Sequence, residues 1–216
     1  MKEEIKRQAI RLFTISGYGG VSFGDITEQL GTTRANIHYH FGSKSGLAEE
    51  VLDAAADNVL RHYREIWTDP SKTLKQKLGL SYAFNEKRYR EYNGSGEGRI
   101  WSLIARFRIE RNVVTQKMVS RLNEVTKANE EFVRTAVLQA IANKELTSDA
   151  PVDEICCLIS GVIHFAPLIS QAPHDIRRLE ETYLSLSHLI EKAYAKPANR
   201  ARRAPAARRS RAGGVS

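Results

Sequence analysis

Cysteine is scarce in this 216-residue chain, which has only two, Cys156 and Cys157, side by side. Adjacent residues on a helix point about 100° apart, so these two sulfur atoms cannot reach disulfide geometry. The scarcity and the adjacency together exclude a disulfide framework. We expect two buried thiols, in keeping with a reducing cytosol.

Long apolar runs are also lacking. No segment approaches the roughly 18–20 consecutive apolar residues that a membrane span requires. The N-terminal stretch MKEEIKRQAIRLF is amphipathic and has no apolar signal-peptide core. The sequence therefore predicts a cytoplasmic protein with no membrane partner.

Acidic residues are missing from the C-terminal end, although the rest of the chain balances its charges. The formal net charge is +8, and residues 192–216 carry all of it. From about residue 196 the composition shifts to Ala, Arg, Pro, Gly and Ser, so we expect a disordered basic tail over 196–216. A non-specific nucleic-acid arm and a solvated extension both remain open for it. The basic residues are Lys192, Lys196, Arg200, Arg202, Arg203, Arg208, Arg209 and Arg211.

What the chain does contain, between residues 22 and 44, is a pair of short helices around a tight turn. Ser22 is a candidate N-cap, and Asp25 three residues later can complete a capping box. Gly31 then supplies the helix stop, because it tolerates the left-handed conformation. Thr33 can cap the second helix. This arrangement predicts a helix-turn-helix.

The second helix, over 34–41, has an apolar inner face and a polar, aromatic outer face. Ile37 and Phe41 share the inner side, which a plain helical hairpin would also explain. Such a hairpin leaves the outward Tyr39 and Lys44 unexplained, whereas a recognition helix enters the major groove with side chains of this kind. Arg pairs with guanine, Asn with adenine and Ala with the thymine methyl, while Tyr, His and Lys suit phosphates. The predicted DNA-binding residues are Thr33, Arg34, Ala35, Asn36, His38, Tyr39, His40 and Lys44.

Residues 6–52 resemble the DNA-binding domain of the tetracycline-repressor (TetR) family of bacterial regulators. The shared pattern is an apolar helix, a glycine, a capped helix, a second glycine, and a short helix ending in aromatics and a lysine. One position departs from the pattern: His38 stands where the family most often has Tyr, so the base preference there is open. The matching segments are AIRLF, Gly17, SFGDITEQL, Gly31, NIHYHF and Gly42–Lys44.

The rest of the chain predicts only helices, because apolar residues recur every three or four positions and no strand-period segment stands out. The fold class is therefore all-α, with about nine helices. We expect three parts: a three-helix DNA-binding domain at 1–46, a helical effector-binding and dimerisation bundle at 47–195, and the tail at 196–216. The predicted helices beyond the helix-turn-helix are 2–16, 44–67, 72–92, 99–110, 112–144, 152–170 and 175–194.

The last two predicted helices have more apolar surface than one neighbour can cover. In the last helix, apolar residues alternate at three and four positions in a narrow seam, and Leu184 and Leu189 add a second face. A protein that reads two half-sites needs two copies, so we predict a homodimer through these helices, with an intramolecular core as the alternative. The predicted interface residues are Ile176, Leu179, Tyr183, Leu186 and Ile190.

The family resemblance implies an effector held inside the C-terminal bundle. Ligand pockets are lined by aromatic side chains with a few placed polar groups. The identity of the effector cannot be read from the sequence. The candidate pocket residues are Trp67, Phe84, Trp101, Phe107, Phe132, His164 and Phe165.

No metal, cofactor or catalytic site is predicted. Cys157 and His164 fall on one helix face but make only half of a four-ligand site. Ser, His and Asp occur in no spacing that implies a triad. The sequence thus predicts a DNA-binding transcriptional regulator, a repressor released from its operator by a small molecule. An architectural DNA-binding protein without an effector is the first alternative, and a helical enzyme is the second.

Overall fold

The structure is a computed structural model that describes residues 1–94, 96–171 and 176–196. Regular structure in these ranges is entirely α-helical, apart from an isolated bridge between Leu146 and Ala195. The predicted all-α fold is confirmed. The helices are α1 (Lys2–Ser16), α2 (Phe23–Leu30), α3 (Arg34–Phe41), α4 (Lys44–Thr68), α5 (Leu74–Tyr92), α6 (Leu103–Ile109), α7 (Gln116–Ala142), α8 (Val152–Ile169) and α9 (Ile176–Tyr194).

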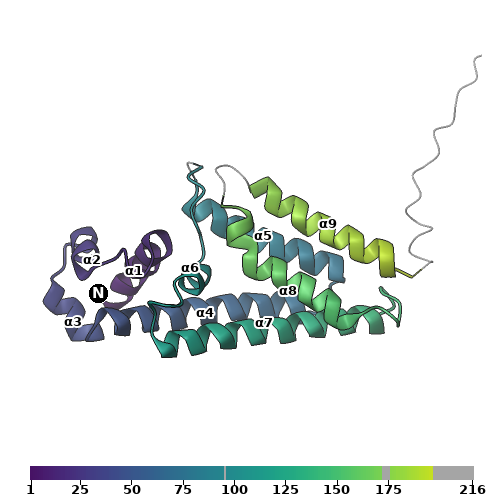
Figure 1. The fold of residues 1–216 in the computed structure, drawn as a ribbon, viewed down its shortest axis with the longest axis horizontal. Helices are drawn as coiled ribbons and strands as arrows, with labels where there is room; N and C mark the ends of the chain where they lie inside the picture. The colour runs from purple at the N-terminus through teal and green to yellow at the C-terminus, as the bar shows by residue number, and fades with distance from the viewer. Residues whose placement is uncertain (95, 172–175, 197–216) are drawn as a thin grey trace, which may run out of the picture.

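The molecule is elongated, with a small head at one end and a larger bundle at the other (Figure 1). Helices α1, α2 and α3 form the head. Helix α4 begins in the head and continues into the bundle, where it packs along α7. Helices α5, α8 and α9 complete the bundle, and the short α6 lies between the head and the bundle. One helix, α4, therefore belongs to both parts.

Two helices begin later than the sequence predicts, because side-chain hydrogen bonds fix the backbone before α6 and a turn precedes α7. The Asn93 side chain accepts a hydrogen bond from the amide of Arg99 and donates one to its carbonyl. Helix α6 starts only at Leu103, where Ser102 provides the cap. Helix α7 likewise starts at Gln116, because Thr115 caps it. The predicted starts at residues 99 and 112 are therefore wrong by about one turn.

The apolar seam of α9 faces the core of its own bundle. Leu179, Tyr183, Leu186 and Ile190 are buried where α9 packs on α5 and α8, and Ile176 is partly buried. The Tyr183 hydroxyl accepts a hydrogen bond of 3.0 Å from Asn85. The prediction that this seam forms the dimer interface is wrong, because the seam is buried against α5 and α8 of the same chain. The alternative, an intramolecular core, is correct. The basic tail beyond residue 196 lies outside the described residues.

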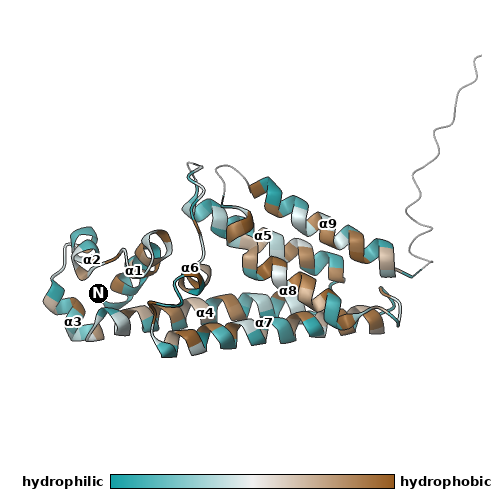
Figure 2. Ribbon diagram, viewed as in Figure 1, coloured by the Kyte–Doolittle hydropathy of each residue, from teal (hydrophilic) through white to brown (hydrophobic). Residues whose placement is uncertain are grey.

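The other faces of α8 and α9 carry large apolar side chains exposed to solvent. Figure 2 shows brown over much of α8, while α9 alternates between apolar and polar residues. Leu158 and Phe165 of α8 are 58% and 59% exposed, and Leu184 and Leu189 of α9 are also exposed. The second apolar face of α9, formed by Leu184 and Leu189, is therefore the one that the bundle leaves exposed.

Helix α8 differs from expectation in two further ways. It is long and apolar enough to cross a membrane by length and composition, so the expectation that no segment approaches that limit is wrong. In this fold it packs against α7 and α9 as part of the bundle. Cys156 is buried as predicted, whereas Cys157 is exposed.

Candidate DNA-binding and ligand-binding sites

The turn that joins α2 to α3 is built by the caps that the sequence predicts. Ser22 and Asp25 form a reciprocal capping box at the start of α2. Their hydrogen bonds hold the pKa of the Asp25 carboxyl below its ordinary value, so its negative charge stays at the helix N-terminus. Gly31 ends α2 in the left-handed conformation with φ +61°, and the Thr33 hydroxyl accepts from the amide of Asn36. Local interactions therefore fix the angle at which α3 leaves the turn.

Helix α3 lies at the tip of the head, at the end away from the bundle (Figure 1). Ile37 and Phe41 are buried, whereas Tyr39 is 85% exposed. Thr33, Arg34, Ala35 and His38 are exposed as well, and Asn36 and His40 are partly exposed. All of these except Lys44, discussed below, lie where a partner outside the chain can reach them.

Two side chains on this face are already oriented by hydrogen bonds. Asn36 donates to the Thr32 hydroxyl over 2.9 Å, which leaves its amide oxygen and a second N–H available. His38 Nδ1 lies 2.8 Å from the Gly42 carbonyl oxygen. Because a carbonyl only accepts, Nδ1 is the donor, and in the neutral ring Nε2 is left as an acceptor. An acceptor at that point matches the exocyclic amino groups of adenine and cytosine.

The Lys44 side chain forms its hydrogen bonds within the protein. Its ammonium donates to the carbonyls of Tyr18 and Val21 over 2.9 and 3.0 Å, and it lies 4.4 Å from the centre of the Tyr18 ring. These contacts tie the loop between α1 and α2 to the start of α4. Two of the three ammonium donors are occupied by backbone carbonyls, so Lys44 has a scaffold role, and its predicted contact with phosphate stays a prediction for the remaining donor.

Helix α6 connects the bundle to the head. Arg106 donates to the carbonyls of Thr14 and Ile15 at the end of α1, over 3.1 and 2.9 Å. Glu110 accepts from the Tyr18 amide over 2.6 Å. A Cβ at Gly17, whose φ is +76°, would come within 1.8 Å of a Glu110 oxygen, so only glycine permits this approach. The head and α6 are therefore joined by several hydrogen bonds.

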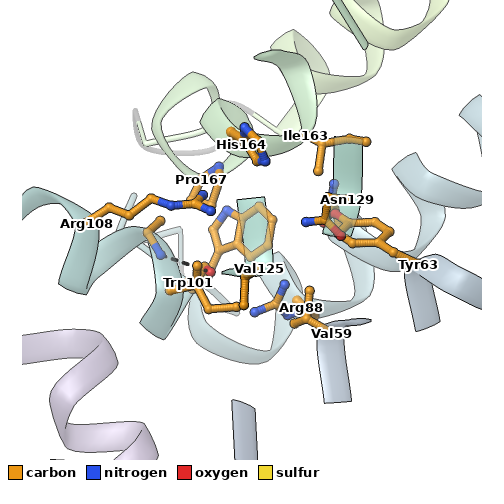
Figure 3. A pocket seen from close by; sticks show the side chains of 14 residues that line it. Val59, Tyr63, Arg88, Trp101, Arg108, Val125, Asn129, Ile163, His164 and Pro167 are labelled. Carbon is orange, nitrogen blue, oxygen red and sulfur yellow. Dashed lines mark hydrogen bonds between the residues drawn. The ribbon is translucent and has the colours of Figure 1, made fainter. Parts of the chain in front are cut away.

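Within the bundle, a cavity of about 30 Å³ lies between α4, α5, α6, α7 and α8. Figure 3 shows Arg88, Arg108 and His164 around the Trp101 indole, with Tyr63 and Asn129 nearby. The Trp101 N–H donates to Ser170 over 2.9 Å, so its polar edge is satisfied. This volume accommodates one or two water molecules.

Of the seven predicted pocket residues, Trp101 and His164 line this cavity. The other five do not, because their side chains face elsewhere. Trp67 and Phe107 are wholly buried core residues, and Phe165 lies on the surface of α8. Phe84 stacks on His62, and Phe132 packs under Arg64. These five residues therefore do not line this cavity, and their role as ligand contacts stays a prediction.

Among residues 1–94, 96–171 and 176–196, no group of three His, Cys, Asp or Glu side chains is placed to hold a metal ion. Cys157 and His164 do line a common surface depression, with Arg134 and Asp153 beside them. Arg134 and Asp153 form an ion pair with each other.

Residues 5–51 match the family model described as bacterial regulatory proteins, tetR family. These residues are therefore a TetR-family DNA-binding domain. Over 81 residues it is 31% identical to the HTH-type transcriptional regulator AcrR of Shigella flexneri, covering 36% of this chain and 38% of that protein. Over 57 residues it is 35% identical to the negative regulator IcaR of the Staphylococcus aureus biofilm operon icaADBC, covering 26% of this chain and 31% of IcaR. The matches thus span about a third of each curated relative.

The whole fold is also similar to solved TetR structures. A TetR regulator from Chloroflexus aurantiacus matches with a TM-score of 0.74 and 24% identity, covering 90% of this chain and 96% of that one. A TetR-family regulator from Agrobacterium tumefaciens matches with a TM-score of 0.74 and 17% identity, covering 90% and 97%. At these identities the likeness establishes the fold alone.

The charged residues of the cavity were not predicted from the sequence. None of Arg88, Arg108 and Asn129 was among the candidate pocket residues. The available signal was weak: Arg108 follows Phe107 directly in the segment LIARFRI. Only the position of α6 against α7 and α8 turns that side chain into the bundle.

Acid is expected to destabilise this protein through His164. Burial, with the positive charge of Arg108 nearby, lowers the pKa of His164 from 6.5 to about 4. In the unfolded chain the His164 ring is protonated below about pH 6.5, whereas in the native protein it is protonated only below about pH 4. The free energy of unfolding should therefore fall between pH 6.5 and 4, by about 3 kcal/mol in total from this residue.

Urea unfolding at pH 7 and pH 5 measures this effect. The loss on acidification should be smaller in His164→Gln than in the unsubstituted protein. His40→Gln, on α3 and away from both the cavity and the faces proposed for dimerisation, is the control and should leave the loss unchanged. An equal acid sensitivity in all three proteins would contradict the assignment.

Proposed function

We propose that the protein is a homodimeric transcriptional repressor that binds an operator through α3 and is released by a small molecule bound in the bundle. The exposed face of α3, with Asn36, His38 and Tyr39 held on a capped helix, is the observation that carries the proposal. The matched relative IcaR is named a negative transcriptional regulator, which favours repression. The proposed location is the cytoplasm, where such a protein meets DNA.

In the proposed complex, α3 lies in the major groove. The Arg34, Ala35, Asn36 and His38 side chains face base edges, and Tyr39 and His40 contact phosphates. Thr33 keeps its capping role and adds a hydroxyl near the backbone. Lys44 contributes indirectly, because its two carbonyl bonds hold the loop before α2.

We propose dimerisation through the free faces of α8 and α9. Leu158 and Phe165 are seven residues apart and so lie on one side of α8, with Gly161 between them. A small residue there permits close approach of a second helix. Contiguous exposed apolar side chains mark interaction sites, and a homodimer supplies the two half-sites of an operator.

Release by an effector is supported by how α6 is placed. Arg108 of α6 lines the cavity, while Arg106 and Glu110 of the same helix bind the head. A ligand that displaces α6 must disturb those contacts. An effector that binds the displaced form better than the DNA-bound form therefore lowers operator affinity.

Selection of DNA from a random pool, followed by affinity measurement at fixed salt, tests this function. The protein should enrich one palindromic motif. Tyr39→Ala should weaken binding to it strongly, while Tyr39→Phe, which keeps the ring, should weaken it less. His38→Tyr should change the base preferred at one position of each half-site, since a good base contact discriminates by about 1–3 kcal/mol.

The alternatives predict other results. Enrichment of no motif, with affinity set by salt alone, would favour the architectural DNA-binding protein. No DNA binding in the folded, dimeric protein would refute the proposed function.

A further inference from the structure

The cavity in the bundle contains two positively charged side chains and no carboxylate. Arg88 and Arg108 are both partly buried. In the part of the chain that the structure describes, neither forms an ion pair with an acidic residue, unlike Arg121, which reaches Asp53, Asp57 and Glu124. Burial lowers the pKa of both guanidinium groups, yet a guanidinium stays charged at any physiological pH.

The contacts that these arginines do make satisfy only a fraction of their donors. Arg108 donates one hydrogen bond, of 2.7 Å, to the Thr126 hydroxyl. Arg88 lies over the rings of Phe84 and Trp101, at 5.4 and 5.2 Å. Each guanidinium has five N–H donors. Cation–π contacts of this kind stabilise the charge but leave the in-plane N–H groups available.

Two further polar atoms at the cavity have no partner. Asn129 is 3% exposed, and its amide oxygen accepts no hydrogen bond in the described structure. His164 Nε2 is likewise buried without a partner. By contrast, Tyr63, Asn85 and Tyr183 are linked by hydrogen bonds of 3.1 and 3.0 Å. Buried polar groups are normally hydrogen-bonded, so the unpartnered atoms of Asn129 and His164 are exceptions that a ligand could satisfy.

We propose that this cavity binds a small organic anion whose carboxylate or phosphate lies between Arg88 and Arg108. This inference rests on the proposed effector function and specifies the chemical class of the effector. Arg recognises both groups through charge-assisted, often bidentate, hydrogen bonds. The Asn129 amide and the neutral His164 ring supply hydrogen bonds to polar atoms on the rest of the ligand. Trp101 offers an apolar face.

The volume of the cavity makes binding inseparable from movement. At about 30 Å³ it cannot hold an organic anion unless the surrounding side chains separate. Trp101 directly precedes the Ser102 cap of α6, and Arg108 lies within that helix. Drawing Arg108 toward an anion therefore shifts α6, whose Arg106 is bonded to the end of α1.

Calorimetric titration of the full-length dimer tests the inference. The anionic probes are acetate, benzoate, inorganic phosphate and phenyl phosphate, and the neutral ones are acetamide and benzamide, all at equal ionic strength. At least one anion should bind saturably. For acetate or benzoate, binding should be at least tenfold tighter than that of the corresponding amide.

Arg88→Gln and Arg108→Gln should each weaken that binding at least tenfold. Arg61→Gln, an exposed arginine on α4, should not change it. Thermal unfolding of each variant verifies that it is folded, and Arg88→Lys and Arg108→Lys, which keep the charge, should retain part of the affinity. Saturable binding that survives both glutamine substitutions, equal binding of the neutral probes, or no saturable binding of any anion would overturn the inference.

Operator affinity is measured separately, so the two proposals fail in different ways. If an anion binds through Arg88 and Arg108 but operator affinity is unchanged, the anion site holds and release by an effector is refuted. If the operator is bound and no anion binds, the anionic class is refuted and DNA binding stands.

Discussion

Leu158→Glu is expected to give a folded monomer that binds the operator at least a hundredfold more weakly. Leu158 is 58% exposed on α8, so glutamate costs little in the isolated protomer. In the proposed dimer the same carboxylate would be buried without a partner, which is costly. Loss of the second DNA-binding head removes the gain from bivalency, about 10²–10⁴-fold. Sedimentation and DNA-binding measurements at fixed salt check both effects.

Two matched substitutions distinguish interface from core. Leu186→Glu places the charge inside the protomer, where the side chain is buried, and should unfold the bundle instead of producing a monomer. Leu80→Glu changes an exposed leucine of α5 and should leave a dimer with normal operator affinity. A stable Leu158→Glu dimer would place the interface elsewhere.

Phe107→Ala is expected to lower the free energy of unfolding by about 3–5 kcal/mol, the usual cost of removing a buried aromatic ring. Phe107 is wholly buried, and its ring packs against Phe13 of α1 and Tyr18 of the following loop, with centroids 5.8 and 6.4 Å apart. The substitution therefore opens a cavity between α6 and the head. Equilibrium unfolding in urea measures the loss.

Tyr39→Ala is the matched control for that experiment. This ring lies in the same head but is exposed, so its removal should change stability by less than about 0.5 kcal/mol while reducing operator binding. If Phe107→Ala is as stable as the unsubstituted protein, the contact between α6 and the head contributes little.

The helix-turn-helix could be predicted because its determinants are close together in the sequence. The Ser22–Asp25 box, the Gly31 stop and the Thr33 cap each involve residues within a few positions, and each is confirmed. The order of the helices could be predicted for a similar reason, since helical periodicity is local. Two starts were missed because loop hydrogen bonds and caps, such as Asn93 with Arg99 and Thr115 before α7, do not appear in the helical periodicity.

The cavity and the free surface could not be predicted, because they depend on which helix covers which face. The α9 seam and its second face are both apolar in sequence, and only packing against α5 and α8 decides which one is buried. Phe107 and Trp101 lie six residues apart, yet one faces the head and the other the cavity. Lys44 matches a phosphate-binding pattern, but the carbonyls it binds belong to a loop more than twenty residues earlier.

The unbroken course of α4 has a mechanical consequence. Its 25 residues extend for about 37 Å, from the cap beside α3 to the bundle, and Val59 and Tyr63 of this helix line the cavity. No flexible joint separates the two ends, so the helix acts as a lever. A tilt of about 5° at the cavity would carry the other end through about 3 Å. Two such levers in a dimer would set the spacing of the recognition helices, which must stay near one turn of DNA, about 34 Å. A rearrangement too small to alter the fold of either part is thus large enough to move the heads out of register with the grooves.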